Sequence, residues 1–123
     1  MGIRNRMLLG VVAAMLAAPA ASAQSDPLSE LDAMVNASTP AAGIALARKQ
    51  VAAGELNGAL GTLERVLMND PRSDAALLLH VSLLCRVDDK PGARAEVAEM
   101  RGISRSQPGW AEVDAACGPG MRP

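Results

Sequence analysis

Few residues in this chain could carry chemistry, and their spacing does not bring them together. His80 is the only histidine, and the nearest hydroxyl group, on Ser82, lies two residues away on another helical face. A zinc site needs three or four convergent nitrogen or sulfur ligands, whereas Cys85 is five residues from His80 and points elsewhere. Asp88 and Asp89 stand in a predicted turn and are typical of a helix end rather than of an acid–base pair. We therefore predict no catalytic residue, no metal site and no cofactor, and we expect His80 to be a packing residue.

Cys85 and Cys117 are the only two thiols of the chain. An even cysteine count in an exported protein favours a disulfide bond. That bond would close a loop of about 32 residues and contribute roughly 3–4 kcal/mol to stability by the chain-entropy estimate. No Cys-x-x-Cys motif is present, which argues against a redox-catalytic role. The alternative is two unpaired thiols, one packed between helices and one near the terminus.

The N-terminus has the three parts of a secretory signal peptide. Arg4 and Arg6 form a short basic region, residues 7–18 form an apolar run, and small residues occupy positions 21–23. The apolar run is shorter than the roughly 20 residues that span a bilayer. We predict cleavage after Ala23 and a periplasmic or secreted protein with no stable membrane insertion. An uncleaved anchor helix is the alternative.

Composition after cleavage excludes several classes of partner. The mature chain would hold ten basic and thirteen acidic residues, a net charge of −3. Nucleic acid and anionic lipid both call for a basic surface, so neither is expected. The chain has no Phe or Tyr, and Trp110 is its only aromatic residue. Core volume must therefore come from aliphatic side chains, with alanines allowing close helix approach.

Apolar and small residues recur at a spacing of 34 residues. The pairs are Ala41/Ala75, Ala42/Ala76, Ile44/Leu78, Val51/Cys85, Gly58/Gly92, Ala59/Ala93, Leu63/Val97 and Val66/Met100. A fixed period of this length is typical of stacked helical hairpins, which bury their apolar faces against neighbours.

Helix start and stop signals divide the chain into six helical segments. Prolines open four of them, after Asp26, Thr39, Lys90 and Gln107, because a first-turn proline lacks only an N–H that would be unpaired anyway. Gly54, Gly102 and Gly118 provide stops. The predicted helices lie within residues 27–38, 40–53, 56–69, 74–87, 91–101 and 108–117.

These residues resemble the tetratricopeptide repeat (TPR), a 34-residue helix–turn–helix unit. In the first unit, the residues that fall at family positions are Leu46, Ala47, Gly54, Ala59, Leu63 and Pro71, and in the second unit they are His80, Val81, Ala93 and Val97. A third unit is expected to begin near Gln107, with Trp110 close to the position of the family's Trp, but only its first helix remains. The pattern departs from the family where Gly43, Gln50, Leu63 and Arg105 replace the Trp, Tyr, Phe and terminal Pro.

The resemblance implies an all-α fold of antiparallel hairpins stacked as a short solenoid. Its parts would be a leader with a short helix (24–39), two repeats (40–102) and a C-terminal capping helix and tail (103–123). The first helices of such repeats line a concave binding face. Carried over by position, the partner-binding residues would be Ile44, Arg48, Val51, Leu78, Ser82 and Arg86.

Arg48 and Arg86 would be the only charges on that face, and guanidinium groups pair well with carboxylates. An acidic or C-terminal peptide is thus one expected ligand, and two solvated arginines are the alternative. We expect an exported, non-catalytic adaptor that binds a protein or peptide partner. The alternative is a structural cap that self-associates as a homo-oligomer, because two repeats fall short of the three usually needed for a stable stack. A third reading, a carrier of small molecules in an apolar groove, has no positive feature in its favour.

Overall fold

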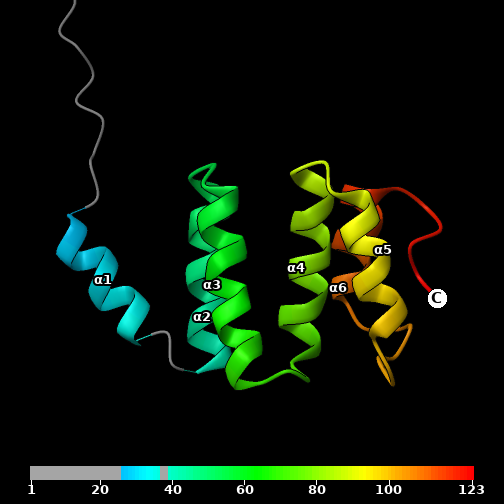
Figure 1. Cartoon of the computed structure of the whole chain (residues 1–123), viewed down its shortest axis with the longest axis horizontal. Coiled ribbons are helices and arrows are strands. Elements are labelled where there is room, and N and C mark those ends of the chain that lie inside the picture. The colour runs from blue at the N-terminus through cyan, green and yellow to red at the C-terminus, as the bar shows by residue number, and fades with distance from the viewer. Residues whose placement is uncertain (1–25, 37–38) are drawn as a thin grey trace, which may run out of the picture.

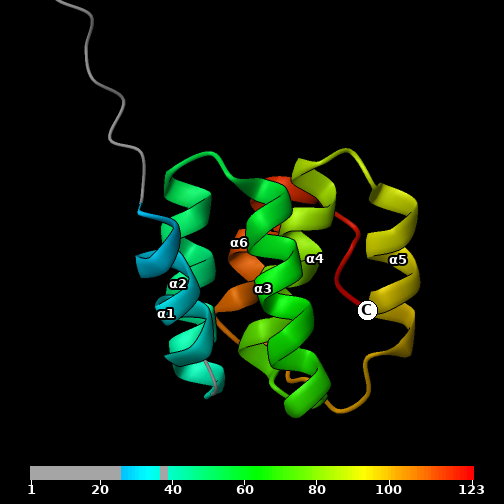
Figure 2. The same ribbon diagram turned by 60° about the vertical axis from the view of Figure 1, so that its left-hand side comes forward.

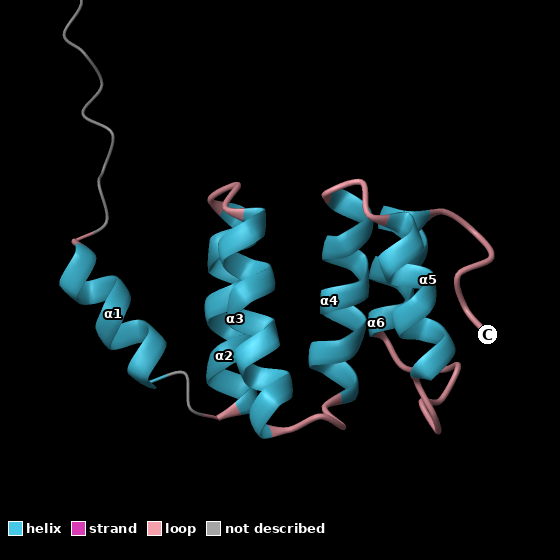
Figure 3. Cartoon of the chain, in the orientation of Figure 1, coloured by secondary structure: helices cyan, strands magenta, loops and turns pink. Residues whose placement is uncertain are grey.

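The computed structural model describes residues 26–36 and 39–123, so the predicted signal peptide, residues 1–23, lies outside the described residues. Within the described ranges the chain forms six helices and no strand (Figure 1; Figure 3). The predicted all-α class is confirmed. The helices are α1 (Pro27–Asn36), α2 (Pro40–Ala52), α3 (Leu56–Asn69), α4 (Asp74–Arg86), α5 (Lys90–Glu99) and α6 (Gly109–Cys117).

Helix caps explain most of these boundaries. Thr39 Oγ1 accepts a hydrogen bond from the Ala42 N–H, which satisfies one of the unpaired donors at the start of α2. The turn between α2 and α3 passes through Gly54 at φ 80°, a left-handed conformation that glycine adopts without steric cost. The turn between α4 and α5 uses Asp88 at φ 67° for the same purpose.

From α2 to α6, five helix ends differ from the sequence predictions by one or two residues. α2 and α4 each end one residue earlier than expected, at Ala52 and Arg86, and the other three ends belong to α5 and α6. α5 begins at Lys90 instead of Pro91, because the Asp89 carboxylate accepts a hydrogen bond from the Gly92 N–H and caps the helix one residue earlier. The same helix ends at Glu99, since Met100 has an extended backbone at ψ 123°. α6 begins at Gly109, one residue after the predicted Pro108.

The helices form two antiparallel hairpins, α2–α3 and α4–α5, with α4 at the centre of the stack (Figure 1). α4 packs against α3, α5 and α6, and its contact with α6 is the most extensive of the three. Every residue from Leu78 to Leu83 is buried, as expected for a helix that is apolar on nearly all sides. α4 divides the apolar interior into two clusters.

The first cluster joins the α2–α3 hairpin to one side of α4. Its buried members are Ala47, Ala59, Leu63, Val66, Ala76, Leu79 and Leu83. Alanines lie where the helices approach closely, as the composition predicted. One polar contact crosses this core: Thr62 Oγ1 donates a buried hydrogen bond of 2.8 Å to Gln50 Oε1. Gln50 lies at the position where the repeat pattern has a Tyr. The hydrogen bond from Thr62 satisfies the buried side-chain carbonyl of Gln50.

The second cluster lies on the other side of α4. Its buried members are Leu78, Val81, Cys85, Ala93, Val97, Trp110, Val113 and Met121. Trp110 is the largest fully buried side chain, and its Nε1–H donates a hydrogen bond to the Ser104 carbonyl. Arg122 pairs with Asp114 and places its guanidinium 5.8 Å from the Trp110 ring centre, so the C-terminal tail is tied to α6.

The position of α6 is the main departure from a regular array. In a regular array α6 would pack on α5 in the way that α4 packs on α3. Instead α6 packs on α4 and makes no extensive contact with α5. Figure 1 shows α6 next to α4, on the side of α4 that is away from α2 and α3. α6 therefore covers α4 and does not extend the stack as a third unit.

Among the residues that the structure describes, no helix has the length and hydrophobicity needed to cross a membrane.

Candidate functional site

The predicted partner-binding face is split by α6 into a covered half and an open half. The covered half is on α4. Leu78 and Ser82 are 1% and 0% exposed, and Leu78 packs in one cluster with Trp110 and Val113 of α6. The backbone of Gly109 approaches Leu78 so closely that an added Cβ would lie 2.9 Å from the Leu78 side chain. The Ser82 hydroxyl donates to the Leu79 carbonyl in its own helix. Leu78 and Ser82, which were expected to face a partner, are therefore buried within the chain, and Leu78 contacts α6.

The open half is on α2. Ile44 and Val51 are half-buried and pack against the first core cluster. Arg48 forms a two-fold hydrogen bond and ion pair with Glu112 of α6, with N–O distances of 3.2 and 3.4 Å. The two side chains are 55% and 37% exposed, so the pair is accessible to solvent and worth little in stability. The carboxylate predicted for Arg48 is thus supplied within the chain.

Arg86 lies at the C-terminal end of α4 and is exposed. It has no ion pair within the described residues. A cation in the last turn favours the helix through its interaction with the helix dipole. The structure therefore places Arg48 and Arg86 in different settings, one paired with α6 and one free in solvent.

The predicted disulfide bond is present between Cys85 of α4 and Cys117 at the end of α6. It holds α6 against the covered half of the binding face. Cys85 lies three residues after Ser82 and so shares its face of α4. A bond from that face to Cys117 requires that the C-terminal helix lies on it, so the sequence held a signal for the α6 position.

His80 lies at the middle of a polar cluster between the two hairpins. Its Nδ1 atom is 2.7 Å from Glu96 Oε2 of α5, and its Nε2 atom is 4.0 Å from Glu64 Oε1 of α3. As predicted, the imidazole is largely buried. The Nε2 atom and Glu96 Oε1 are both buried and have no hydrogen-bond partner within the described residues. Sequence reasoning missed Glu64 and Glu96, since no spacing rule connects residues on three helices.

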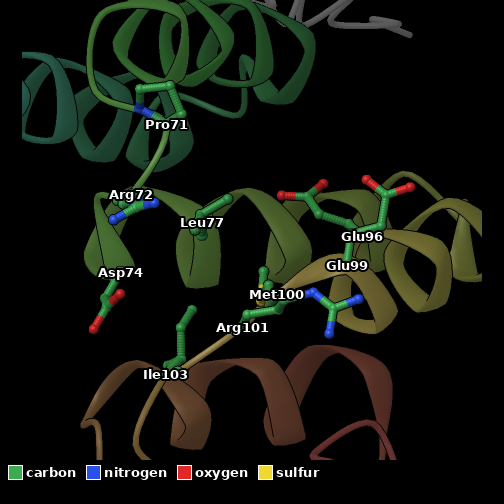
Figure 4. A pocket seen from close by; sticks show the side chains of 10 residues that line it. Pro71, Arg72, Asp74, Leu77, Glu96, Glu99, Met100, Arg101 and Ile103 are labelled. Atoms are coloured by element: carbon green, nitrogen blue, oxygen red, sulfur yellow. The ribbon is translucent and has the colours of Figure 1, made fainter.

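A cavity of about 740 Å³ lies next to this cluster (Figure 4). Leu77, Met100 and Ile103 provide its apolar lining. Its charged lining residues are Arg72, Asp74, Glu96, Glu99 and Arg101. In Figure 4 the carboxylates of Glu96 and Glu99 lie on one side of Leu77, and Arg72 and Asp74 lie on the other. The Asp74 carboxylate already accepts a hydrogen bond from Gln107.

An exposed apolar surface lies at the opposite end of the molecule. Leu28 and Leu31 of α1 are 69% and 55% exposed. They lie three residues apart and share one face of the helix. α1 contacts α2, but far less extensively than α2 contacts α3. Large exposed apolar patches are typical of surfaces that bind another protein, and these leucines are exposed apolar residues of α1.

Across the described ranges, no group of three or more His, Cys, Asp or Glu side chains is arranged to hold a metal ion. Ser82, the hydroxyl nearest to His80 in sequence, is buried and bonded to its own helix. The prominent surface features of the described residues are therefore the exposed leucines of α1, the Arg48–Glu112 pair between α2 and α6, and the cavity next to Glu96.

Comparisons with protein-family models, with curated proteins and with solved structures find no match to this chain.

Proposed function

We propose that the chain is an exported, non-catalytic protein-binding module of the TPR type, and that its partner docks at the α1–α2 end. The observation that carries this proposal is the difference in exposure between the two ends of the stack. α6 and the disulfide cover the α4 end, whereas Leu28 and Leu31 remain exposed beside α2. Exposed apolar patches mark surfaces that bind other proteins, and these two leucines lie three residues apart on one face of α1.

Export is part of the proposal, through the predicted signal peptide of residues 1–23 and cleavage after Ala23. The Cys85–Cys117 bond agrees with an oxidising compartment such as the periplasm or the cell exterior. The partner surface then comprises Leu28 and Leu31 together with Ile44, Arg48 and Val51 of α2. A partner carboxylate can compete with Glu112 for Arg48, because an exposed ion pair is weak.

A second candidate, self-association through α1, is favoured by the charges of these helices. α1 carries Glu30 and Asp32 and no basic residue, and α2 carries Arg48 and Lys49 and no acidic residue. α1 of one copy could therefore pair with α2 of another.

Site-specific photocrosslinking in producing cells separates the two candidates. A benzophenone side chain replaces Leu28 or, as a matched control, Ala115, which is exposed on α6. An adduct with a different protein at position 28, absent at position 115, supports the adaptor. An adduct of twice the chain mass at position 28 supports self-association. No adduct at position 28, with the exported protein present in the expected amount, contradicts both.

Charge reversal sharpens the adaptor test. Arg48→Glu should abolish the heterologous adduct, whereas Arg86→Glu should leave it unchanged because Arg86 lies at the far end of α4. Equal loss in both variants would argue against docking at α2.

A further inference from the structure

Residues 118–123 follow α6 and form a tail that lies beside α5, at the end of the stack opposite α1 (Figure 1; Figure 2). Arg122 of this tail makes three contacts. Its guanidinium group pairs with the Asp114 carboxylate of α6 and donates a hydrogen bond of 3.1 Å to the Arg105 carbonyl. The same group lies 5.8 Å from the centre of the Trp110 ring. A carboxylate, a carbonyl and an aromatic ring therefore surround one arginine head group.

Met121, the residue before Arg122, provides the apolar part of the contact. It is 7% exposed and belongs to the core cluster that α4, α5 and α6 share, whereas Gly120 and Arg122 on either side of it are exposed. One buried apolar residue and one arginine thus attach the tail. We call the surface that receives this pair the tail site. It comprises the Arg105 carbonyl, Trp110, Asp114 and the cluster residues that pack with Met121.

The backbone of the tail contributes little to this attachment. Within the described part of the chain, residues 119–123 make no backbone hydrogen bond to the rest of the molecule. Gly118 and Gly120 have φ angles of 83° and 94°, and glycine loses more conformational freedom than other residues when it is ordered. The Arg122–Asp114 pair is partly exposed, so water weakens it. The tail is therefore held by two side chains, and its release breaks no helix.

A site that holds only two side chains can hold the same pair from another polypeptide. Arginine suits the polar part better than lysine does, because its planar group can bond a carboxylate and a carbonyl together and also stack on an aromatic face. An apolar residue directly before that arginine would take the place of Met121. Gly120 and Pro123 are exposed, so the surface leaves room for a longer segment on both sides of the pair.

We propose that the tail site binds an apolar–Arg pair of a partner polypeptide, and that Met121 and Arg122 occupy the site when this partner is absent. Only residues 118–120 connect the pair to α6, so the tail competes at an effective concentration in roughly the millimolar range. A partner displaces it through additional contacts beside the site. The tail site lies at the opposite end of the stack from α1, so it stands or falls independently of the function proposed above.

NMR of the disulfide-bonded full chain, labelled at the methionine methyl groups, tests displacement directly. The probe is the capped tail peptide acetyl-Gly-Pro-Gly-Met-Arg-Pro-amide. We expect roughly millimolar peptide to move the Met121 methyl resonance, in a saturable way, to the position of a solvent-exposed methionine. Met68, which is exposed on α3, should not respond. Peptides with Ser for Met or Gln for Arg should bind about tenfold and about fivefold more weakly, because they lack the apolar burial or the charged contacts.

Substitutions in the chain separate the tail from its site, with affinity measured on the Trp110 indole resonance. Arg122→Gln weakens the competing tail, so this variant should bind the peptide about fivefold more tightly than the wild type. In that background Asp114→Asn should lower the affinity about fivefold, because the peptide arginine loses its carboxylate. Glu112→Gln is the matched control on α6. Its carboxylate pairs with Arg48, so the peptide affinity should not change.

Three results would overturn the proposal. One is a Trp110 resonance that does not respond to the peptide in the wild type or in Arg122→Gln, which alters only an exposed side chain and so preserves the fold. The second is equal affinity for the tail peptide and its Ser and Gln counterparts. The third is a wild-type dimer in sedimentation that the tail peptide dissociates, because the occupant of the site would then be a second copy of this chain.

Discussion

The two ends of the helix stack are completed in different ways. At the α4 end, α6 buries Trp110 and Val113, the tail buries Met121, and a disulfide bond fixes the arrangement. At the α2 end, the described part of the chain provides α1 alone, and Leu28 and Leu31 of α1 are exposed. A stack of two hairpins has two open ends, and this chain provides a covalently fixed cover for only one. The comparison teaches that the open end is the place to look for a partner.

Reducing the Cys85–Cys117 bond should have the largest effect on this difference. We expect the free energy of unfolding to fall by about 3–4 kcal/mol, because the unfolded chain regains the freedom of a 32-residue loop. Urea unfolding followed by circular dichroism, with and without reductant, measures the change. The Leu31→Ser variant is the control. Reduction of the disulfide bond should lower its free energy of unfolding by the same amount, because Leu31 lies at the opposite end of the stack from that bond. Identical unfolding midpoints for the oxidised and reduced protein would show that the bond does not stabilise the α4 end.

Gly109→Ala should have the next largest effect. An added Cβ would lie 2.9 Å from Leu78, so α6 must shift on α4, at a cost of about 1–3 kcal/mol. Gly61→Ala in α3 is the matched control, because a Cβ there meets nothing within 4 Å. That control should gain about 0.5–1 kcal/mol from better helix propensity. Urea unfolding measures both changes. A lower free energy of unfolding in Gly109→Ala and a higher one in Gly61→Ala would confirm close packing of α6. An unchanged free energy of unfolding in Gly109→Ala would contradict it.

Asp88→Gly should stabilise the α4–α5 turn slightly. Asp88 adopts the left-handed conformation that Gly54 adopts in the other hairpin. Glycine relieves the strain of this backbone conformation, but it also has greater freedom in the unfolded chain, which offsets part of the effect. We therefore expect the free energy of unfolding to rise by about 0.5 kcal/mol. Gly54→Ala should instead cost about 1 kcal/mol. Thermal unfolding of the two variants gives the comparison, and a loss of stability in Asp88→Gly would contradict the strain at this turn.

The Arg48–Glu112 pair should have the smallest effect. It is the ion pair that joins α2 to α6, and both side chains are exposed. A double-mutant cycle with Arg48→Ala and Glu112→Ala should give a coupling energy of about 0.5 kcal/mol or less, decreasing with added salt. A coupling energy several times larger would mean that α6 also closes the α2 side of the stack.

Local features were predictable from the sequence because they depend on residues close in the chain. Thr39 and Pro40 predicted the start of α2, and Gly54 predicted its end. The Cys85–Cys117 bond followed from the cysteine count. The all-α class followed from the 34-residue period and the absence of strand patterns.

The candidate sites were harder to predict because they depend on how helices from different units pack. Leu78 and Ser82 were expected to face a partner, since the position of α6 was taken to follow the repeat. The contact of His80 with Glu96 depends on the placement of α5 against α4, which no local pattern specifies. Sequence reasoning therefore assigned the wrong exposure to Leu78 and Ser82 of α4.

Trp110 has one more consequence for the way this molecule can be observed. As the only aromatic residue of the chain, it supplies all of the intrinsic ultraviolet fluorescence, and it lies in the cluster on the α6 side of α4. The α2–α3 hairpin contains no aromatic residue and contributes no fluorescence of its own. A melting curve recorded by emission therefore follows one half of the protein, and its coincidence with a curve from amide absorption would show that the two halves melt as a single cooperative unit.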